Sequence, residues 1–97
     1  MPTKIQLYIG ADNTIKKITP EYERNIERIL SKYWKNFTLT KCKGFYQGEV
    51  EESILAVIVV LQLVLQDLHS CIEELKVKLV QETIVCEITA DIDFKLR

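Results

Sequence analysis

The stretch GFYQGEVEESILAVIVV, residues 44–60, decides the fold of this chain. It ends in an unbroken apolar run, Ile54 to Val60, that is rich in β-branched residues. A strand that is apolar on both faces is typical of the middle of a sheet, because edge or half-exposed strands alternate between apolar and polar residues. We therefore predict a central strand here, and we expect the rest of the chain to cover it.

Two elements are predicted before this strand. Residues 4–10 alternate between apolar and polar side chains, which indicates a half-buried strand that Gly10 ends. Thr19 and Pro20 then mark a helix start, since Thr caps helices and Pro suits the first helical position. Apolar residues follow at helical spacing from Tyr22 onward, and the first plausible stop is Asn36.

Residues 37–46 predict a second strand. Lys41 and Lys43 blur its alternation, so we place it at or near an edge of the sheet, where lysines discourage unwanted strand pairing. Gln47-Gly48 is a two-residue turn, which predicts a hairpin between this strand and the central one.

The second half of the chain predicts one more helix and one more strand. Apolar residues spaced by four, three and four positions indicate a second amphipathic helix: Leu68, Ile72, Leu75 and Leu79. Residues 83–94 return to strict alternation and predict the last strand. The boundary after Val60 is open, because nothing in residues 61–65 marks a turn and a helix continuing from Ile54 is the alternative.

The resulting order is β-α-β-β-α-β over a single domain, residues 1–97. It predicts the α+β, ferredoxin-like arrangement, a four-stranded antiparallel sheet with two helices on one face. In that topology the first and third strands form the central pair, which agrees with the apolar run lying in the third strand.

The sheet face that the helices leave uncovered is expected to have an apolar centre and a polar rim. The third strand supplies the apolar centre. The rim comes from the first and last strands: Lys4, Gln6, Tyr8, Val85, Glu87, Thr89, Asp91 and Asp93. Such a face resembles an interface, and we predict a homodimer that buries it. The alternative is a solvated face crossed by long side chains.

Composition excludes several classes of protein. A net charge of −1 gives no attraction to nucleic acid or to anionic lipid. The longest uncharged run, residues 53–66, is shorter than the ~20 residues that span a bilayer as a helix. The N-terminal segment MPTKIQLYIG lacks the pattern of a signal peptide. Three cysteines without C-x-x-C spacing predict neither a disulfide framework nor a zinc site, so we expect a cytoplasmic protein.

Charge is uneven along the chain. Residues 1–48 carry nine basic and four acidic side chains, and residues 49–97 carry four basic and ten acidic ones. The halves can neutralise each other within one fold. The alternative is a bipolar surface that favours self-association or one charged ligand.

The loop from Gly10 to Thr19 is one candidate binding site. It follows a strand and precedes a helix N-terminus, and it contains Asn13, Lys16 and Lys17. Exposed backbone N–H groups beside two cations suit an anion such as phosphate. A solvated lysine pair in a loop is the simpler interpretation.

The carboxylates that open residues 49–53 are the second candidate site. Glu52 and Ser53 could contact a ligand, act in catalysis or merely form a polar turn. Tyr8 and Tyr46 are candidate aromatic contacts, although no RNA-recognition segment accompanies them. His69, the only histidine, lacks a partner that would make it a base. No catalytic residue is assigned, and no metal ion or cofactor is expected.

Several short motifs resemble a family of small uncharacterised bacterial and phage domains. They are Leu7-Tyr8-Ile9-Gly10, Gly44-Phe45-Tyr46-Gln47-Gly48, Glu52-Ser53 and Gln81-Glu82-Thr83-Ile84-Val85. The family pattern has Trp in the glycine turn and Ser where this chain has Thr83. The resemblance covers nearly the whole chain. It implies the fold, supplies no chemistry, and adds Gln81 to the residues of interest.

The sequence favours a non-enzymatic, homo-oligomeric binding domain for a small anionic or nucleotide-like ligand. The first alternative is a protein-interaction or inhibitor domain, such as a phage accessory protein that acts against host defence. The second is a cofactor-free enzyme of the dimeric α+β barrel type, working in a cavity between two open sheet faces.

Overall fold

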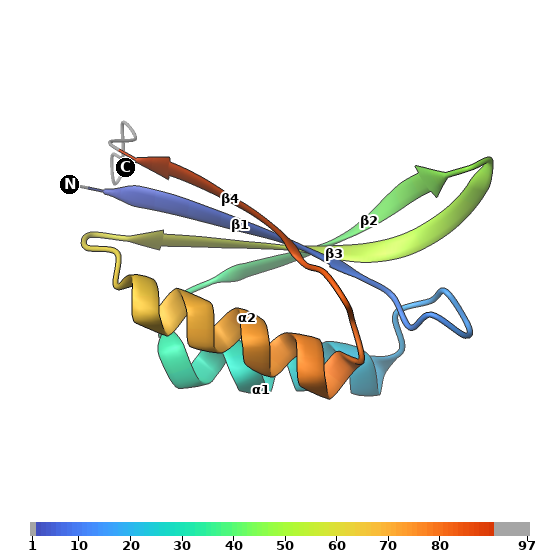
Figure 1. The fold of residues 1–97 in the computed structure, drawn as a ribbon, viewed down its shortest axis with the longest axis horizontal. Helices are drawn as coiled ribbons and strands as arrows, with labels where there is room; N and C mark the ends of the chain where they lie inside the picture. Colours follow the sequence, from blue (N-terminus) through green and yellow to red (C-terminus); the bar gives the residue numbers. More distant parts are fainter. Residues whose placement is uncertain (1, 91–97) are drawn as a thin grey trace.

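A computed structural model describes residues 2–90 of the chain, except for the side chain of Tyr46. Its elements follow the predicted β-α-β-β-α-β order (Figure 1). Their bounds are β1 Thr3–Gly10, α1 Pro20–Tyr33, β2 Thr38–Tyr46, β3 Glu49–Val60, α2 Leu65–Leu79 and β4 Val85–Ala90. The fold is thus the α+β, ferredoxin-like one that the sequence predicts.

The four strands form one antiparallel sheet in the order β2-β3-β1-β4. Strands β1 and β3 are the central pair and run in register from Thr3 opposite Val60 to Gly10 opposite Ser53. Strand β2 pairs along β3, and β4 pairs along β1. The apolar run of β3 is therefore paired on both sides, as predicted, and the strand interpretation replaces the alternative of a helix from Ile54.

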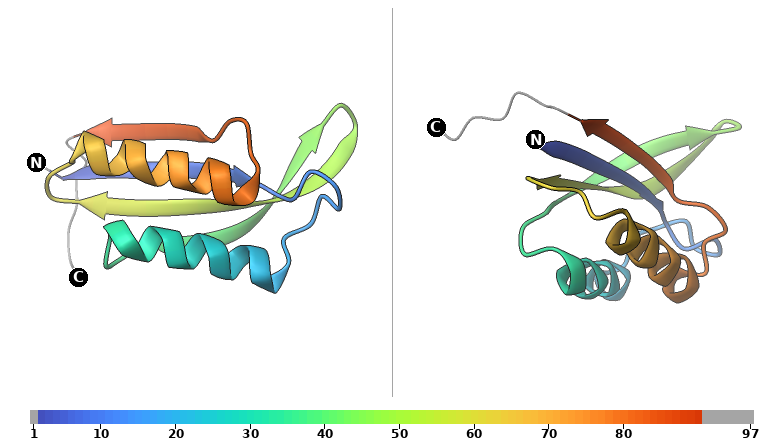
Figure 2. Two further views of the ribbon diagram at one scale, coloured as in Figure 1. Left: turned by 60° about the horizontal axis from the view of Figure 1, so that its bottom comes forward. Right: turned by 60° about the vertical axis from the view of Figure 1, so that its left-hand side comes forward.

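Helices α1 and α2 lie side by side on one face of the sheet (Figure 2). The side chains that β1 and β3 direct toward the helices are almost completely buried: Ile5, Leu7, Ile9, Ile54, Ala56 and Ile58. Helices contribute Ile26, Leu30, Cys71 and Leu75 to the same core. Burial of this alternating set fixes the strand register, since a one-residue shift would turn it to the other face.

Local chemistry sets the helix ends. The side chain of Thr19 accepts a hydrogen bond from the Tyr22 backbone N–H, with Pro20 at the first helical position, as predicted. The end differs from the prediction, because α1 stops at Tyr33 and Trp34 is already extended, whereas Asn36 was expected. Trp34 and Phe37 reach the core from the connecting loop instead of from the helix. Apolar spacing alone could not show whether Trp34 and Phe37 reach the core from the helix or from the loop that follows it.

Strand β4 also departs from its prediction. The alternating pattern placed Ile88 on the helix-facing side, and its partner Ile5 does face the core. Ile88 is nevertheless 45% exposed, because it lies on an edge strand that no further strand covers. Residues 91–94, which the sequence assigned to the same strand, lie outside the described residues.

The hairpin of β2 and β3 extends past the end of β1. Pairing of β1 with β3 stops at Gly10 and Ser53, whereas β2 and β3 remain paired out to Tyr46 and Glu49. We call residues 43–52 the arm; it projects beyond the helices in Figure 1. Positive φ angles at Gln47 and Gly48 form its turn. A two-stranded ribbon has little stability of its own, so the arm depends on contacts at its base.

Within residues 2–90, the open sheet face has the composition that the sequence predicts; Asp91 and Asp93 of the predicted rim lie outside the described residues. The β3 side chains on this face, Leu55, Val57 and Val59, are only half-buried, and Tyr8 beside them is 39% exposed. Among the described residues, no helix is long and apolar enough to cross a membrane.

Replacing Ile58 with Ala should destabilise the fold strongly. Ile58 is a residue of the central strand β3, and its side chain is fully buried under the helices. The cavity left by an Ile→Ala change costs about 2–5 kcal/mol of folding free energy. The free energy of unfolding should be measured in a urea titration, with Val77→Ala as control, because Val77 is 79% exposed on α2. Equal losses in both variants would contradict the described core.

Candidate functional site

The loop between β1 and α1 lies against the base of the arm. Its contact with β3 is through both backbone and side chain: Glu52 N–H donates to the Lys16 carbonyl at 3.3 Å, and the Ile18 N–H donates to the Glu52 carboxylate at 2.7 Å. The loop thereby continues the sheet where β1 has ended. Glu52, one of the candidate residues, holds the loop in this place.

Lys16 forms the second link between loop and arm. Its Nζ donates to the Glu51 carboxylate at 3.0 Å and to the Glu49 carboxylate at 3.3 Å, and these hydrogen bonds, first that to Glu51, raise the pKa of Lys16. Lys16 adopts a positive φ of 58°, an uncommon conformation for a residue with a Cβ. Glu49 and Glu51 of the arm thus neutralise Lys16, one of the two lysines that the sequence analysis predicted to bind an anion.

Four N–H groups of this loop, those of Thr14, Ile15, Lys16 and Ile18, already have internal acceptors. The Asp12 carboxylate accepts from Thr14 N–H at 2.7 Å and from Ile15 N–H at 3.2 Å, and the Asp12 carbonyl accepts from Lys16 N–H at 2.8 Å. Lys17 is exposed, and no ion pair to it is found within residues 2–90. An anion bound here would compete with carboxylates for the same donors. The predicted anion site remains a prediction that this geometry does not favour.

A buried tyrosine joins the end of β1 to both helices. The Tyr22 hydroxyl donates to the Gly10 carbonyl at 2.5 Å and accepts from Gln81 Nε2 at 3.1 Å. The same Gln81 nitrogen donates to the Ala11 carbonyl at 2.8 Å. Burial, foremost, raises the pKa of Tyr22. Gly10 and Gln81, two candidate residues distant in sequence, are therefore in one network.

The C-terminal end of α2 presents Gln81 to this network. Val80 adopts a left-handed conformation with φ 53°, which is strained for a β-branched residue. Its N–H and that of Gln81 return to carbonyls of the last helical turn, which closes the helix. The Val80 carbonyl accepts from Asn13 Nδ2 at 3.3 Å. Asn13 thus stabilises the loop from the side opposite to Glu52.

Tyr8 lies on the open sheet face, apart from this loop. Its hydroxyl donates to the Glu87 carboxylate at 2.6 Å, and this hydrogen bond is the main cause of its raised pKa. Cys42 and Ser53 are cross-strand partners on the same face, and Ser53 in turn pairs with Gly10. The structure does not describe the side chain of Tyr46, so its predicted contact is not tested.

Of the nine candidate residues, six lie close together, Tyr8 and Lys17 lie apart from them, and the side chain of Tyr46 is not described. Loop, arm base and helix end hold six of them together: Gly10, Asn13, Lys16, Glu52, Ser53 and Gln81. Tyr8 belongs to the open face, where Ser53 also points, and Lys17 projects into solvent. Sequence reasoning missed Tyr22 as a polar anchor because its helical spacing marked it as core. It also missed the pairing of Tyr8 with Glu87, which only strand order reveals.

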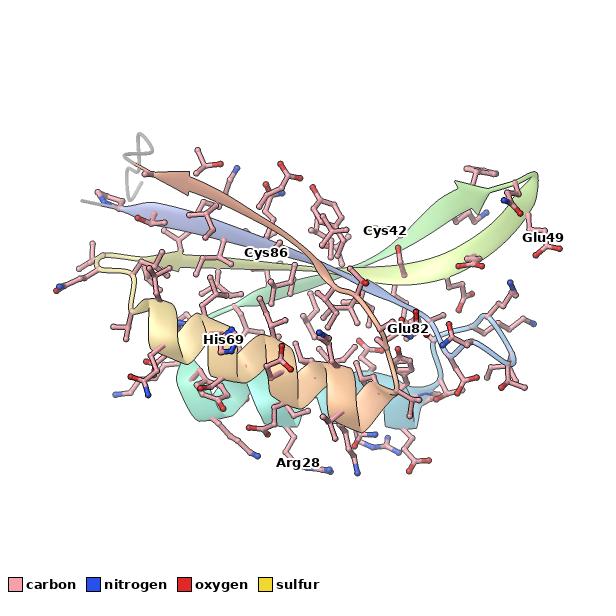
Figure 3. The ribbon with its side chains drawn as sticks, viewed as in Figure 1. Arg28, Cys42, Glu49, His69, Glu82 and Cys86 are labelled. Atoms are coloured by element: carbon pink, nitrogen blue, oxygen red, sulfur yellow. The ribbon has the colours of Figure 1, made fainter. Side chains whose placement is uncertain are left out.

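A groove of about 740 Å³ runs along the outer surface between α1 and α2. It contains a network in which Glu74 accepts from Lys32 and, at 2.8 Å, from the Tyr33 hydroxyl. These hydrogen bonds, first that of Lys32, lower the pKa of Glu74. His69 and Arg28 lie along the same side of the molecule (Figure 3). His69 has no side-chain hydrogen bond within the described residues, so nothing there orients it as a base.

The cysteines do not form a reactive centre. All three are free, and burial raises the pKa of Cys71 to about 12. Cys42 lies on β2 and Cys86 on β4 (Figure 3), with two strands between them. Within residues 2–90, no group of three His, Cys, Asp or Glu side chains could hold a metal ion.

Comparison with known proteins supports the fold and leaves the family open. No family model matches the sequence, and no curated protein matches it significantly. Among solved structures, a DUF3240 family protein from Shewanella baltica superposes with a TM-score of 0.66 at 12% identity, over 98% of this chain and 97% of that one. The resemblance to small bacterial and phage domains therefore stays a prediction.

Two further solved structures share the fold. A phage SAM lyase in its apo state gives a TM-score of 0.61 at 21% identity, over 90% of this chain and 78% of that one. The periplasmic divalent cation tolerance protein CutA from Archaeoglobus fulgidus gives a TM-score of 0.52 at 17% identity. The superposition covers 100% of this chain and 89% of that one. At these identities the similarity defines a fold class, which is the ferredoxin-like class of small α+β domains.

Replacing Tyr22 with Phe should destabilise the fold by about 1–3 kcal/mol. The change leaves the Gly10 carbonyl and the Gln81 amide without the hydroxyl, and a buried polar group without its partner costs about that much. Tyr8→Phe is the matched control, because its hydrogen bond is exposed. Urea unfolding monitored by circular dichroism should separate the two variants, and similar stabilities would argue against the network.

Cys71 should resist alkylation while the protein is folded. Its thiol is fully buried and has a pKa of about 12, so almost no thiolate forms at pH 8. Iodoacetamide followed by peptide mass spectrometry should leave Cys71 unmodified in buffer and modify it in guanidinium. Equal modification in both solvents would contradict its position in the core.

Proposed function

We propose that this chain is a homo-oligomeric binding domain that holds a small nucleotide-like ligand on its open sheet face. The observation that carries the proposal is the apolar stripe of Leu55, Val57 and Val59, which the helices do not cover. A monomer rarely leaves a contiguous apolar stripe in water, so a second copy is the expected cover. A cytoplasmic location belongs to the same proposal.

Electrostatics refine the class of ligand. The carboxylates on the open face and its continuation along the arm are Glu49, Glu51 and Glu87. They outnumber the two cations Lys4 and Lys16, of which Lys16 is already paired with Glu49 and Glu51. An anionic ligand would meet net negative charge, and a ligand that carries positive charge would be attracted. The exposed ring of Tyr8 offers a surface on which a base can stack or a cation can rest.

S-adenosylmethionine combines these properties, because it joins an adenine base to a positively charged sulfonium. One of the structurally similar proteins is a phage SAM lyase. Fold similarity at 21% identity does not transfer activity, but it makes this compound the first ligand to test. The proposed contacts are Tyr8 with the base or the sulfonium, and Glu87 and the arm carboxylates with the positive charge.

Turnover of the same ligand is the second candidate function. The similarity to a lyase favours it, as does a Tyr–carboxylate pair on a face that assembly would enclose. In such a reaction these groups would hold the sulfonium in place for cleavage of a carbon–sulfur bond, which releases a neutral thioether. Binding without turnover remains the primary proposal.

Binding should be measured by isothermal titration calorimetry with S-adenosylmethionine, S-adenosylhomocysteine and ATP. We expect the sulfonium compound to bind more tightly than the neutral thioether, and ATP to bind least, because the face is acidic. Tyr8→Ala should weaken binding at least about fivefold, which corresponds to the ~1 kcal/mol of a cation–aromatic contact.

His69→Ala is the control variant, because His69 is exposed on the helix side, away from the open face. It should bind as the unchanged protein does. Chromatography of the titrated mixture for a thioether nucleoside separates turnover from binding. No heat with any of the three compounds, or tightest binding of ATP, would overturn the proposed ligand class.

A further inference from the structure

The sheet has two edges at which backbone hydrogen-bonding groups have no strand partner. Within the described residues, β2 pairs only with β3, and β4 pairs only with β1. Each edge presents a row of N–H and C=O groups that can accept a strand from another molecule. Residues 85–90 of β4 contain no proline, glycine or lysine that would discourage such pairing. Val85 on the open face of β4 and Ile88 on its helix side are both exposed.

The charges of the edges decide which edges can pair. β2 carries Lys41 and Lys43, and β4 carries Glu87. Pairing of two β2 edges would bring lysines together, and pairing of two β4 edges would bring Glu87 close to its copy. Paired strands lie about 4.8 Å apart, well within the ~8 Å Debye length at physiological salt, so these charges are felt across the joint. Pairing of β2 with β4 avoids both repulsions, because Lys41 and Lys43 point to the helix side of the sheet and Glu87 points to the open face.

We propose that β2 of one copy pairs with β4 of the next, and that this contact repeats until a closed ring forms. Within one sheet, β2 and β4 run in opposite directions. A rotation about an axis parallel to the strands leaves the direction of every strand unchanged. In copies related by such a rotation, β2 of one copy and β4 of the next therefore run in opposite directions and pair as antiparallel strands. A contact between two different surfaces must close into a ring or grow without limit, and closure leaves no edge exposed.

Side chains on both sides of the joint are compatible with this pairing. On the open face, β2 presents Thr38, Thr40 and Cys42, and β4 presents Val85 and Thr89 beside Glu87. Small and β-branched residues make favourable cross-strand pairs. On the helix side, the aliphatic stems of Lys41 and Lys43 can cover Ile88, which is 45% exposed in one copy.

Ring closure completes the candidate ligand site. It turns the open faces toward the common axis, which buries the stripe of Leu55, Val57 and Val59. The pair Tyr8 and Glu87 of one copy then lies beside β2 of the next copy, with its Cys42. The ligand would be bound between copies, and a single copy would hold only half of its contacts. This inference rests on the assembly that the proposed function includes.

Disulfide cross-linking tests which edges meet. The protein already carries Cys42 on the open-face side of β2, and Cys86→Ala removes the thiol of β4. Into this background Val85→Cys, Glu87→Cys and Thr89→Cys are introduced singly, which samples the register of the joint in steps of two residues. Strands β3 and β1 separate Cys42 from β4 within one copy, so any disulfide between them joins two copies.

In mild oxidant we expect at least one of the three variants to form a series of disulfide-linked species of increasing mass. The heaviest linked species should have the mass of the native ring. The matched controls carry Cys42→Ser in addition and should form no linked species. Folding of every variant is checked by circular dichroism, and its mass in reducing buffer by light scattering.

Each result separates this inference from the proposed function. An oligomer that forms no linked species in any of the three variants would overturn the pairing of β2 with β4 and leave the proposed assembly intact. Linked dimers in the Cys42→Ser controls would show that β4 pairs with β4, which overturns the ring. A monomer in light scattering would overturn the assembly itself.

Discussion

The structure depends on one constraint, which is that the central strand β3 is apolar on both faces. Helices α1 and α2 cover one face and bury Ile54, Ala56 and Ile58 almost completely. They cannot reach the other face, where Leu55, Val57 and Val59 remain half-buried. Hydrophobic burial scales with the apolar area removed from water, so covering this face would stabilise the fold further. Self-assembly is the direct way to realise it.

The polar residues of the loop, arm base and helix end serve a different purpose. Tyr22 and Gln81 satisfy the carbonyls at the end of β1, and Glu52 and Lys16 join the loop to the arm. These hydrogen bonds stabilise the arm at its base, beyond the last residue of β1. They also occupy the groups that would otherwise suit an anion. Several residues that the sequence marks as candidates for ligand binding thus make contacts that hold the fold together, and their part in binding stays a prediction.

In the proposed function, assembly and ligand binding are linked through the geometry of the sheet. The open face carries the aromatic ring of Tyr8 and the carboxylate of Glu87, but a single sheet face gives a ligand contacts on one side only. Small-molecule sites are usually concave and bury most of the ligand. A second copy beside β4 would supply the missing wall. The same edge strands that would otherwise promote aggregation thereby become the elements that shape the site.

The sequence by itself determined the order of elements, the pairing of β1 with β3 and the cap of α1. The order of elements and the cap follow from local chemistry or from side-chain period, which act over a few residues, and the pairing of β1 with β3 follows from the fold that this order predicts. It also identified Gly10, Glu52, Ser53 and Gln81 as residues of interest, although not their partners.

Tertiary structure alone decided that Tyr22 and Gln81 meet at Gly10, that Lys16 is neutralised by the arm, and that Ile88 stays exposed on an edge. These contacts join residues that lie up to some 70 positions apart in the chain. Periodicity predicts which face a side chain takes but not which distant group lies opposite it, because strand order and the placement of the two helices fix that choice.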